Sequence, residues 1–311
     1  MRGQNRKVYP DIINHSYQRT INGDLLFYNV YDGLMFFTIF CVTAPKHGVR
    51  VYKLCLMPDH IHNSSSATRK KDLSSFTQSY TSLYAREFNI VCHEKGSVFQ
   101  SPFGSVPKYG DKKARSNFIY VDNNPVERHL VDKAEKYRWN FLAYSTSDHP
   151  FSEPLIIRNA SKKMMRAIKL VESRHEEGKY LPYVMLKRMF APLSEKEKLQ
   201  LTDFIIVTYD IIDHGWAERF FDSHEAMIEA THSVTGSEHD LNEVFVGKSD
   251  AYYKQMTGIL METGRYRDIH DIFALPVEKR MELLRMLNRR TDATLEQIAK
   301  YLHIPFKTCC G

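Results

Sequence analysis

The sequence predicts an α+β fold followed by a mainly α-helical region. Strand-like segments occur before residue 63, helical apolar spacing recurs between residues 71 and 123, and helical patterns fill the chain after residue 154. The chain has 311 residues, of which 43% are hydrophobic, so it is long enough for two or three domains with sizeable cores.

Within the N-terminal part, strands and helices are expected to alternate. A hairpin is expected first, turning at Asn22-Gly23 between residues 17–20 and 25–28, followed by a helix at 31–45 and a strand at 49–57. A helix at 71–92, capped by Asp72, and an irregular stretch at 96–107 come next. The last expected elements are a helix at 112–123, which ends or kinks at Asn124-Pro125, and a short helix at 126–137.

A segment rich in serine and proline, STSDHPFSEP, separates this part from the helical region. We therefore expect a first domain at residues 1–148 and a helical domain of unknown role at 149–270. Residues 271–311 resemble the first part of a helix-turn-helix, and plain helical packing is the equal alternative.

Positive charge is concentrated in the N-terminal half. The first 150 residues carry 20 Lys and Arg against 13 Asp and Glu, whereas the rest carry 23 against 24. This asymmetry favours a polyanionic partner for the first domain, with ordinary surface variation as the alternative.

Cysteine usage and hydropathy favour a soluble cytoplasmic protein with no membrane partner. No apolar run reaches the length of a bilayer, and the first ten residues lack the apolar core of a secretory signal. No C-x-x-C pair is present, so we expect reduced thiols rather than disulfides or a cysteine zinc site at the five cysteines Cys41, Cys55, Cys92, Cys309 and Cys310.

Two histidines, His60 and His62, follow the predicted strand at 49–57. Residues i and i+2 of a strand point to the same face, so the two imidazoles are expected to lie together, with Ile61 in the core. Such a pair can hold a divalent metal. By itself, an H-x-H tripeptide is more often a solvated strand face.

A second candidate group lies in the helix predicted at 112–123. Tyr120 and Asn124 are four residues apart and therefore share one helical face. The amide oxygen of Asn124 is a suitable ligand for Mg²⁺ or Mn²⁺, and Tyr120 offers a phenol. Core packing of Tyr120 and helix termination at Asn124 form the alternative interpretation.

The order of these motifs resembles the HUH single-strand endonucleases, and within them the REP-associated tyrosine transposases, relatives of the single-tyrosine insertion-sequence transposases. The resemblance covers roughly residues 8–145. It rests on the ordered set His15-Ser16-Tyr17-Gln18-Arg19, Met57-Pro58-Asp59-His60-Ile61-His62, Gly96-Ser97-Val98-Phe99-Gln100, Tyr120-Val121-Asp122-Asn123-Asn124-Pro125-Val126 and Tyr137-Arg138-Trp139.

The resemblance implies an antiparallel sheet flanked by helices, the HUH endonuclease fold. It also implies that Tyr120 is the catalytic nucleophile and that His60, His62 and Asn124 bind a divalent metal, Mg²⁺ or Mn²⁺. His15 and Arg19 are possible supporting residues.

Two departures from the family pattern concern the surroundings of the histidines. The family strand continues apolar after the second histidine, whereas here Asn63-Ser64-Ser65-Ser66 follows, which indicates a shortened strand. Asp59 replaces the usual Asn and could serve as an outer-shell acceptor beside the metal.

The resemblance implies a DNA transposase: a metal-dependent enzyme that cuts and rejoins single-stranded DNA near hairpins or palindromic repeats through a 5′-phosphotyrosine. The alternative is a catalytically silent, domesticated DNA-binding protein that acts as a repressor or architectural factor. The relatives lead us to expect a bacterial, nucleoid-associated monomer or homodimer.

Two basic clusters are candidates for contacts with DNA phosphates, because lysine and arginine side chains can follow a single-stranded backbone. The first cluster consists of Lys108, Lys112, Lys113 and Arg115, and the second of Arg69, Lys70 and Lys71. A solvated face is the alternative for either cluster.

Overall fold

The computed structural model describes residues 7–233 and 250–305. Its centre is a four-stranded antiparallel sheet in the order β2-β3-β1-β4. The strands are β1 Ile13–Arg19, β2 Arg50–Met57, β3 His60–Ser66 and β4 Gly104–Lys108. The two strands that carry the candidate histidines, β1 and β3, are therefore the central pair.

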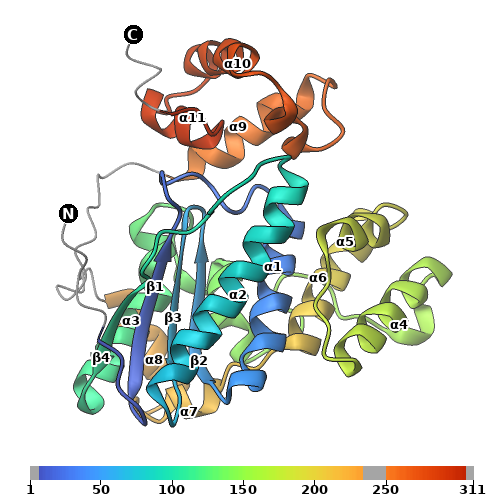
Figure 1. Ribbon diagram of the computed structural model, residues 1–311. Coiled ribbons are helices and arrows are strands. Elements are labelled where there is room, and N and C mark those ends of the chain that lie inside the picture. Colours follow the sequence, from blue (N-terminus) through green and yellow to red (C-terminus); the bar gives the residue numbers. More distant parts are fainter. Residues whose placement is uncertain (1–6, 234–249, 306–311) are drawn as a thin grey trace.

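Helices cover both faces of the sheet (Figure 1). Helices α1 (Val30–Thr43) and α2 (Lys70–Val91) pack on one face, and α3 (Gly110–Glu127) packs on the other, against β2 and β3. The predicted α+β fold with an antiparallel sheet flanked by helices is thereby confirmed.

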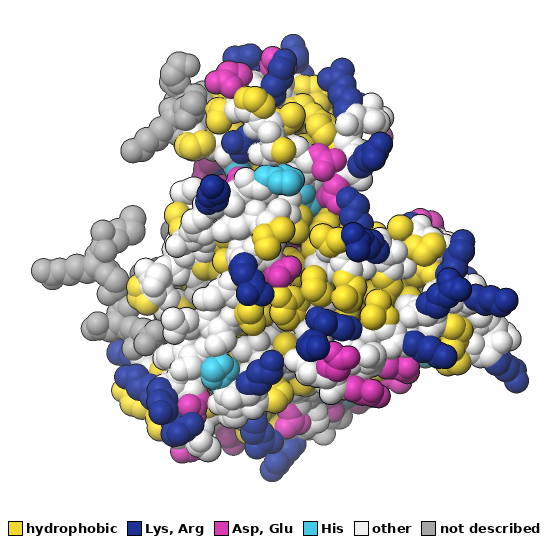
Figure 2. All heavy atoms as spheres, turned by 45° about the vertical axis from the view of Figure 1, so that its right-hand side comes forward, with side chains coloured by type: hydrophobic (Ala, Val, Ile, Leu, Met, Phe, Trp, Pro, Cys, Tyr) yellow, Lys and Arg dark blue, Asp and Glu magenta, His cyan; other side chains and the backbone are white. Residues whose placement is uncertain are grey.

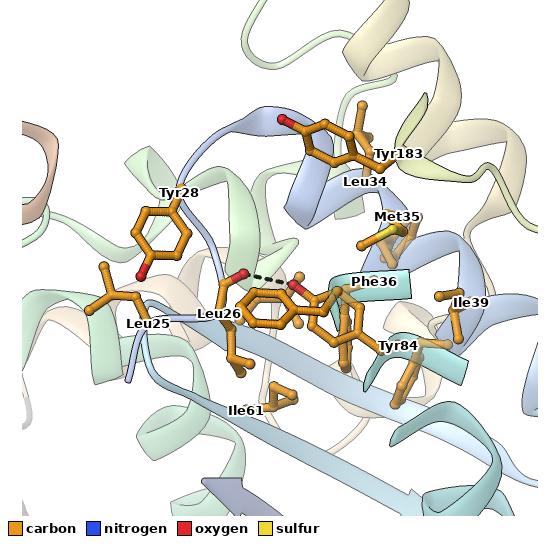
Figure 3. Close-up of a cluster of buried hydrophobic side chains, with 14 of the residues drawn as sticks. Leu25, Leu26, Tyr28, Leu34, Met35, Phe36, Ile39, Ile61, Tyr84 and Tyr183 are labelled. Carbon is orange, nitrogen blue, oxygen red and sulfur yellow. Dashed lines mark hydrogen bonds between the residues drawn. The ribbon is translucent and has the colours of Figure 1, made fainter. Parts of the chain in front are cut away.

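The face covered by α1 and α2 holds a large aromatic core (Figure 3). Ile61 of β3 is fully buried there, below Phe36 and Tyr84, whose ring centroids lie 5.1 Å apart. The Tyr84 hydroxyl donates a hydrogen bond to the Leu26 carbonyl at 2.7 Å, which satisfies the one polar atom of that ring. Because Ile61 points into this core, its neighbours His60 and His62 face the opposite side.

The hairpin predicted at Asn22-Gly23 is wrong. Strand β1 pairs with β3 along one edge and β4 along the other, so no free edge remains for residues 25–28. These residues form a loop instead, in which Leu25 and Leu26 are buried and the Leu26 amide donates to the Pro58 carbonyl at 2.7 Å. Gly23 still supplies the left-handed conformation, with φ of 74°, that the turn needs.

The shortened strand predicted after His62 is also wrong, because β3 continues to Ser66. The polar side chains are buried and hydrogen-bonded. The Ser64 hydroxyl donates to Asn117 Oδ1 at 2.6 Å, and the Ser65 hydroxyl donates to Asn63 Oδ1 at 2.9 Å. Buried hydroxyls cost little when they are paired, so the serine run forms a continuous strand.

Helix α3 is longer than predicted. Pro125 lies inside the helix, which continues to Glu127, rather than ending or kinking it at Asn124. Proline removes one backbone donor, and this loss is small in the last turn of a helix. The short helix predicted at 126–137 is reduced to a single 3₁₀ turn at Ala134–Lys136, and β4 occupies part of the stretch predicted to be irregular.

After residue 154 the described chain is mainly helical, as predicted. Its helices are α4 Lys162–Glu176, α5 Tyr183–Phe190, α6 Glu195–Tyr209, α7 His214–Glu218, α8 His224–Ser233, α9 Ala251–Glu262, α10 Val277–Arg290 and α11 Leu295–Tyr301. Helix α6 packs on α1 and α8 packs on α3, whereas α9, α10 and α11 form a lobe at one end of the sheet (Figure 1).

The domain boundaries expected near residues 148 and 270 stay predictions. One connected hydrophobic cluster includes side chains from Val8 to Ile304 and so draws on all three expected segments. None of the helices in the described ranges has both the length and the apolar character that crossing a membrane requires.

A buried charge network joins the first helix to the C-terminal lobe. His270 is 2% exposed and lies between two carboxylates, with its Nε2 3.2 Å from Asp32 and its Nδ1 2.8 Å from Asp268. Tyr183 and Lys187 of α5 also contact Asp268. Burial alone would lower the pKa of His270, but the charges and hydrogen bonds of Asp32 and Asp268 outweigh it and raise this pKa to about 9.

We predict that the free energy of unfolding falls between pH 6 and pH 9.5 because of His270. A folded pKa of about 9 exceeds the unfolded value of about 6.5. The contribution is therefore full below pH 6.5 and is lost as the pH rises through 9. It amounts to roughly 3 kcal/mol and can be measured by denaturant unfolding at both pH values.

His270→Gln is expected to flatten this dependence and to lower stability at pH 6. Exposed His149 is the matched control, and His149→Gln is expected to behave as wild type. Equal pH dependence in the wild type and in His270→Gln would show that His270 does not titrate in this way.

Candidate functional site

The two candidate histidines lie at the start of β3, on the face covered by α3. Both are fully buried, and their ring centroids are 4.9 Å apart in an edge-to-face arrangement. They point the same way because they are two residues apart on a strand. The sequence prediction of a shared face is confirmed, but this face is covered by helix rather than solvated.

Helix α3 brings Tyr120 and Asn124 onto the same spot. The Tyr120 ring centroid is 5.5 Å from that of His62, and Asn124 Nδ2 is 3.3 Å from His62 Nε2. A spacing of four residues places both side chains on one face of α3. The two halves of the predicted site, some 60 residues apart in sequence, are therefore adjacent in space.

Strand β1 contributes a further row of side chains. His15 Nε2 lies 3.0 Å from His62 Nδ1, and the supporting role of His15 stays a prediction. The Tyr17 ring packs against both His60 and His62, with centroids 5.8 and 5.2 Å away, and the Arg19 guanidinium lies 5.0 Å from the Tyr17 ring centroid.

Tyr17 is the site residue that the sequence reasoning missed. The period-two alternation of a strand through His15, Tyr17 and Arg19 would have placed it on this face. The predicted hairpin obscures this signal, because its first strand begins at residue 17 and so leaves out His15.

The buried polar atoms that have no hydrogen-bond partner within the described ranges include His60 Nε2 and Asn124 Oδ1 of this site. Unpaired buried polar atoms are rare and call for a reason. An imidazole nitrogen and an amide oxygen are both metal-ligand atoms, and these are the residues expected to hold a divalent ion. The donor set therefore fits Mg²⁺ or Mn²⁺.

The hydrogen bonds on the other ring nitrogens support the same orientation. His60 Nδ1 is 2.5 Å from Asp59 Oδ1, which leaves His60 Nε2 to face the site, and His15 holds Nδ1 of His62. Metal-ligating histidines commonly have their second nitrogen held in this way. Among the described residues no three His, Cys, Asp or Glu side chains are grouped to hold a metal, so the set depends on the amide of Asn124.

Two carboxylates, those of Asp59 and Asp250, lie near His60. Burial would raise the pKa of Asp59, but the charge and hydrogen bond of His60, together with Arg128 and Arg19, hold it well below its usual range. Burial and the nearby Asp59 raise the pKa of Asp250 to about 6, against the lowering effect of Arg128 and His60. Asp250 comes from the chain just before α9, and no sequence pattern pointed to it.

A buried ion pair holds α3 on the sheet. Lys53 Nζ of β2 is 2.6 Å from Asp122 Oδ2, and both side chains are at most 3% exposed. Burial raises the pKa of Asp122 despite the opposing charge of Lys53. Asp122 lies midway between Tyr120 and Asn124, so this pair sets the position of both over His62.

The predicted phosphate contacts differ in exposure. Lys108 is only 2% exposed at the end of β4, so it does not lie on the surface with its neighbours in sequence. The other members of both clusters are exposed, namely Lys112, Lys113, Arg115, Arg69, Lys70 and Lys71. Arg69 bonds to Asp72 at 2.8 Å, and Asp72 does not cap α2 as predicted.

Three of the cysteines are buried, namely Cys41, Cys55 and Cys92, and Cys309 and Cys310 fall outside the described residues. Cys55 lies opposite His62 on β2 and packs in the same cluster as Tyr120. Burial raises the pKa of Cys41 and of Cys92 well above the usual value of a thiol. These two thiols therefore have little thiolate character at neutral pH.

Comparison with protein families connects this geometry to a known class. Residues 26–124 match the family described as "Transposase IS200 like". The matched segment includes His60, His62, Tyr120 and Asn124, whereas β1 lies before it. The predicted resemblance to single-tyrosine transposases is confirmed for this segment, which indicates a DNA-processing enzyme.

The search of curated proteins found no match. Among solved structures, the chain is similar to one titled "Structure of the REP associates tyrosine transposase bound to a REP hairpin", with 15% identity and a TM-score of 0.41. That similarity covers 47% of this chain and 86% of the other.

We predict that the chain binds one Mn²⁺ and that His60→Ala or His62→Ala abolishes this binding. Loss of one imidazole leaves too few donors for a stable site. His15→Ala is expected to weaken affinity about 10–100-fold, because it removes the partner that orients His62. Isothermal titration calorimetry with Mn²⁺ alone provides the measurement.

The matched control for this titration is His47→Ala, since His47 bonds to Ser79 on the opposite face of the sheet. It is expected to bind Mn²⁺ as wild type does. Unchanged Mn²⁺ affinity in both His60→Ala and His62→Ala would exclude the site described here.

Proposed function

We propose that the protein is a metal-dependent single-strand DNA endonuclease and strand transferase with Tyr120 as its nucleophile. The observation that carries the proposal is the meeting of His60 and His62 from β3 with Tyr120 and Asn124 from α3. The family match over the same segment supports it.

The proposed reaction exchanges one phosphoester for another. The Tyr120 hydroxyl gives up its proton to solvent, and its oxygen attacks a DNA phosphorus to form a Tyr–O–P bond while the bond from phosphorus to the 3′-oxygen breaks. The departing oxygen takes up a proton and becomes a 3′-hydroxyl, and the 5′-phosphate stays on the tyrosine. Attack by a second 3′-hydroxyl reverses the step, so rejoining needs no outside energy source.

Metal binding would lower the barrier to this step. His60, His62 and Asn124 would hold a divalent ion, which would supply Lewis-acid stabilisation of the phosphate charge and would orient the ester for in-line attack. A free tyrosine has a pKa of about 10, so at neutral pH its hydroxyl must lose the proton as it attacks. His15 and Asp59 act as positioning residues, because each bonds to the second nitrogen of a proposed ligand.

The burial of the tyrosine supports an unpaired substrate. Tyr120 is 6% exposed, beneath the rings of His15 and His62. A rigid duplex cannot bend a phosphate into such a site, whereas a flexible single strand can. The hairpin expected beside the cut is a proposal from the family resemblance, and Lys112, Lys113 and Arg115 are the exposed groups proposed to contact its phosphates.

The catalytically silent alternative loses one of its supports. This support is the polar run after His62, which is expected to disturb the strand that carries the ligands. That run forms regular, hydrogen-bonded strand through Ser66. We therefore propose the active enzyme.

We predict that the protein forms a covalent adduct with labelled single-stranded hairpin DNA in Mn²⁺, and that Tyr120→Phe abolishes it. The phenylalanine keeps the ring contacts with His15 and His62 but has no nucleophilic oxygen. Denaturing gel electrophoresis after incubation detects the adduct.

Tyr17→Phe is the matched comparison, because the Tyr17 ring packs on the same histidines from β1. It is expected to retain the adduct. If the adduct survived Tyr120→Phe and disappeared in Tyr17→Phe, the nucleophile would be Tyr17. Absence of an adduct with hairpins of varied sequence would count against the enzyme.

We predict that replacing Lys112, Lys113 and Arg115 by Gln weakens hairpin binding and reduces its salt dependence. Each lost phosphate contact is expected to lower the slope of log affinity against log salt by about 0.7–0.9. Fluorescence anisotropy at several salt concentrations measures this slope. The control removes three exposed charges from α4, at Lys162, Lys163 and Arg166, and is expected to keep the wild-type slope.

A further inference from the structure

A large cavity lies between the sheet domain and the C-terminal lobe. Its volume is about 580 Å³, within the range of pockets that hold small organic ligands. The start of α1, the segment around residue 137, the helices α5 and α6, and α9 all contribute walls. Figure 2 shows hydrophobic side chains exposed between the upper lobe and the arm on the right, with Lys and Arg side chains bordering them.

Aromatic rings form much of this wall. Trp139 is half-buried and lies directly on the backbone of α1, where a Cβ added to Gly33 would come within 2.5 Å of its ring. Glycine at position 33 therefore allows this position of the indole. Phe27, Tyr31 and Phe151 line the same cavity and are also partly exposed. Partly exposed aromatic faces provide stacking surfaces for nucleobases.

Four basic and two acidic side chains line the cavity. The basic residues are Lys136, Arg138, Lys198 and Lys254, and the acids are Glu195 and Asp250. Three of the cations are ion-paired: Lys198 with Glu195 at 2.6 Å, Arg138 with Asp203, and Lys136 with Asp132 at 2.7 Å. Lys254 is exposed on α9 and has no ion-pair partner in the described chain, so its charge is available to an anion.

The cavity shares a wall with the candidate active site. Pro58 and Tyr137 both line it, and the Tyr137 hydroxyl donates to the Leu56 carbonyl at 2.8 Å, beside the start of β3. On its other side Tyr137 packs in the same hydrophobic cluster as Tyr120. A DNA strand leaving the site thus has the cavity as its neighbour.

We propose that this cavity, the Trp139 cleft, binds the unpaired DNA strand that flanks the scissile phosphate. Bases stack on Trp139 and its aromatic neighbours, and Lys254 contacts the backbone. The inference rests on the proposed function, since it assigns a second contact to the same substrate. A free nucleotide offers the same chemistry, but the position beside Tyr120 favours a strand.

Tryptophan fluorescence can test the cleft without any cleavage. The chain has two tryptophans. In full-length Trp216→Phe, Trp139 is the remaining tryptophan, and the replaced ring stacks on Tyr52 outside the cleft. We expect saturable quenching of Trp139 by an unstructured oligothymidylate and little change with a blunt duplex of equal length. Trp139→Phe, which keeps Trp216, is the matched control and should show no quenching.

Two further measurements, one with a Lys254 variant and one with a free nucleotide, identify the ligand. Lys254→Gln, combined with Trp216→Phe, is expected to weaken oligothymidylate binding at least about threefold and to lower its salt slope by about 0.7. Exposed Lys162→Gln should change neither. Deoxythymidine monophosphate is expected to quench only at much higher concentration. Quenching by the monophosphate at equal concentration, equal quenching by the duplex, or no quenching at all would each overturn the proposal.

The result is separable from that of the adduct experiment. Tyr120→Phe is expected to retain the quenching, since the cleft does not depend on the nucleophile. An adduct without quenching would refute DNA binding in the Trp139 cleft but support the proposed enzyme. Quenching without an adduct would support binding in the cleft but count against the proposed enzyme.

Discussion

The seating of α3 on the polar face of the sheet is the constraint on which the site depends. The buried pair of Lys53 and Asp122 and the hydrogen bond from Ser64 to Asn117 join this helix to β2 and β3. Removing one partner of a buried pair leaves an uncompensated charge, which is far more costly than replacing both. The geometry of Tyr120 and Asn124 over His62 follows from these contacts, because both belong to the same helix.

The two faces of the sheet differ in composition: one packs into an apolar core, and the other carries the polar side chains of the candidate site. On one side Ile61 packs into an aromatic core between α1 and α2, and its loss of exposure stabilises the fold. On the other side the histidines meet α3 in a buried polar layer in which most groups are paired. Two of the atoms that have no partner among the described residues, His60 Nε2 and Asn124 Oδ1, are those that a metal would use. The rigid core thus holds the ligands of the polar layer in place.

The C-terminal helices extend this arrangement rather than forming a separate appendage. Helix α8 covers α3, and Asp250, the N-cap residue of α9, lies close enough to alter the charge balance around Asp59. The network of Asp32, His270 and Asp268 ties the lobe to the start of α1. The wall of the Trp139 cleft is built from the same junction. Features beyond the matched family segment therefore bear on the site and on its surroundings.

The sequence alone determined which local groups face together. A spacing of two on a strand and four on a helix sufficed to pair His60 with His62 and Tyr120 with Asn124, because these periods are properties of the backbone. Tertiary structure decided what lay opposite each pair. Both edges of β1 pair with other strands, which excludes the predicted hairpin and places the Tyr17 ring against His60 and His62. Lys108 is buried, and the side chains of Ser64 and Ser65 are hydrogen-bonded. Such outcomes depend on contacts between segments that are far apart in the sequence, and local periodicity carries no information about those contacts.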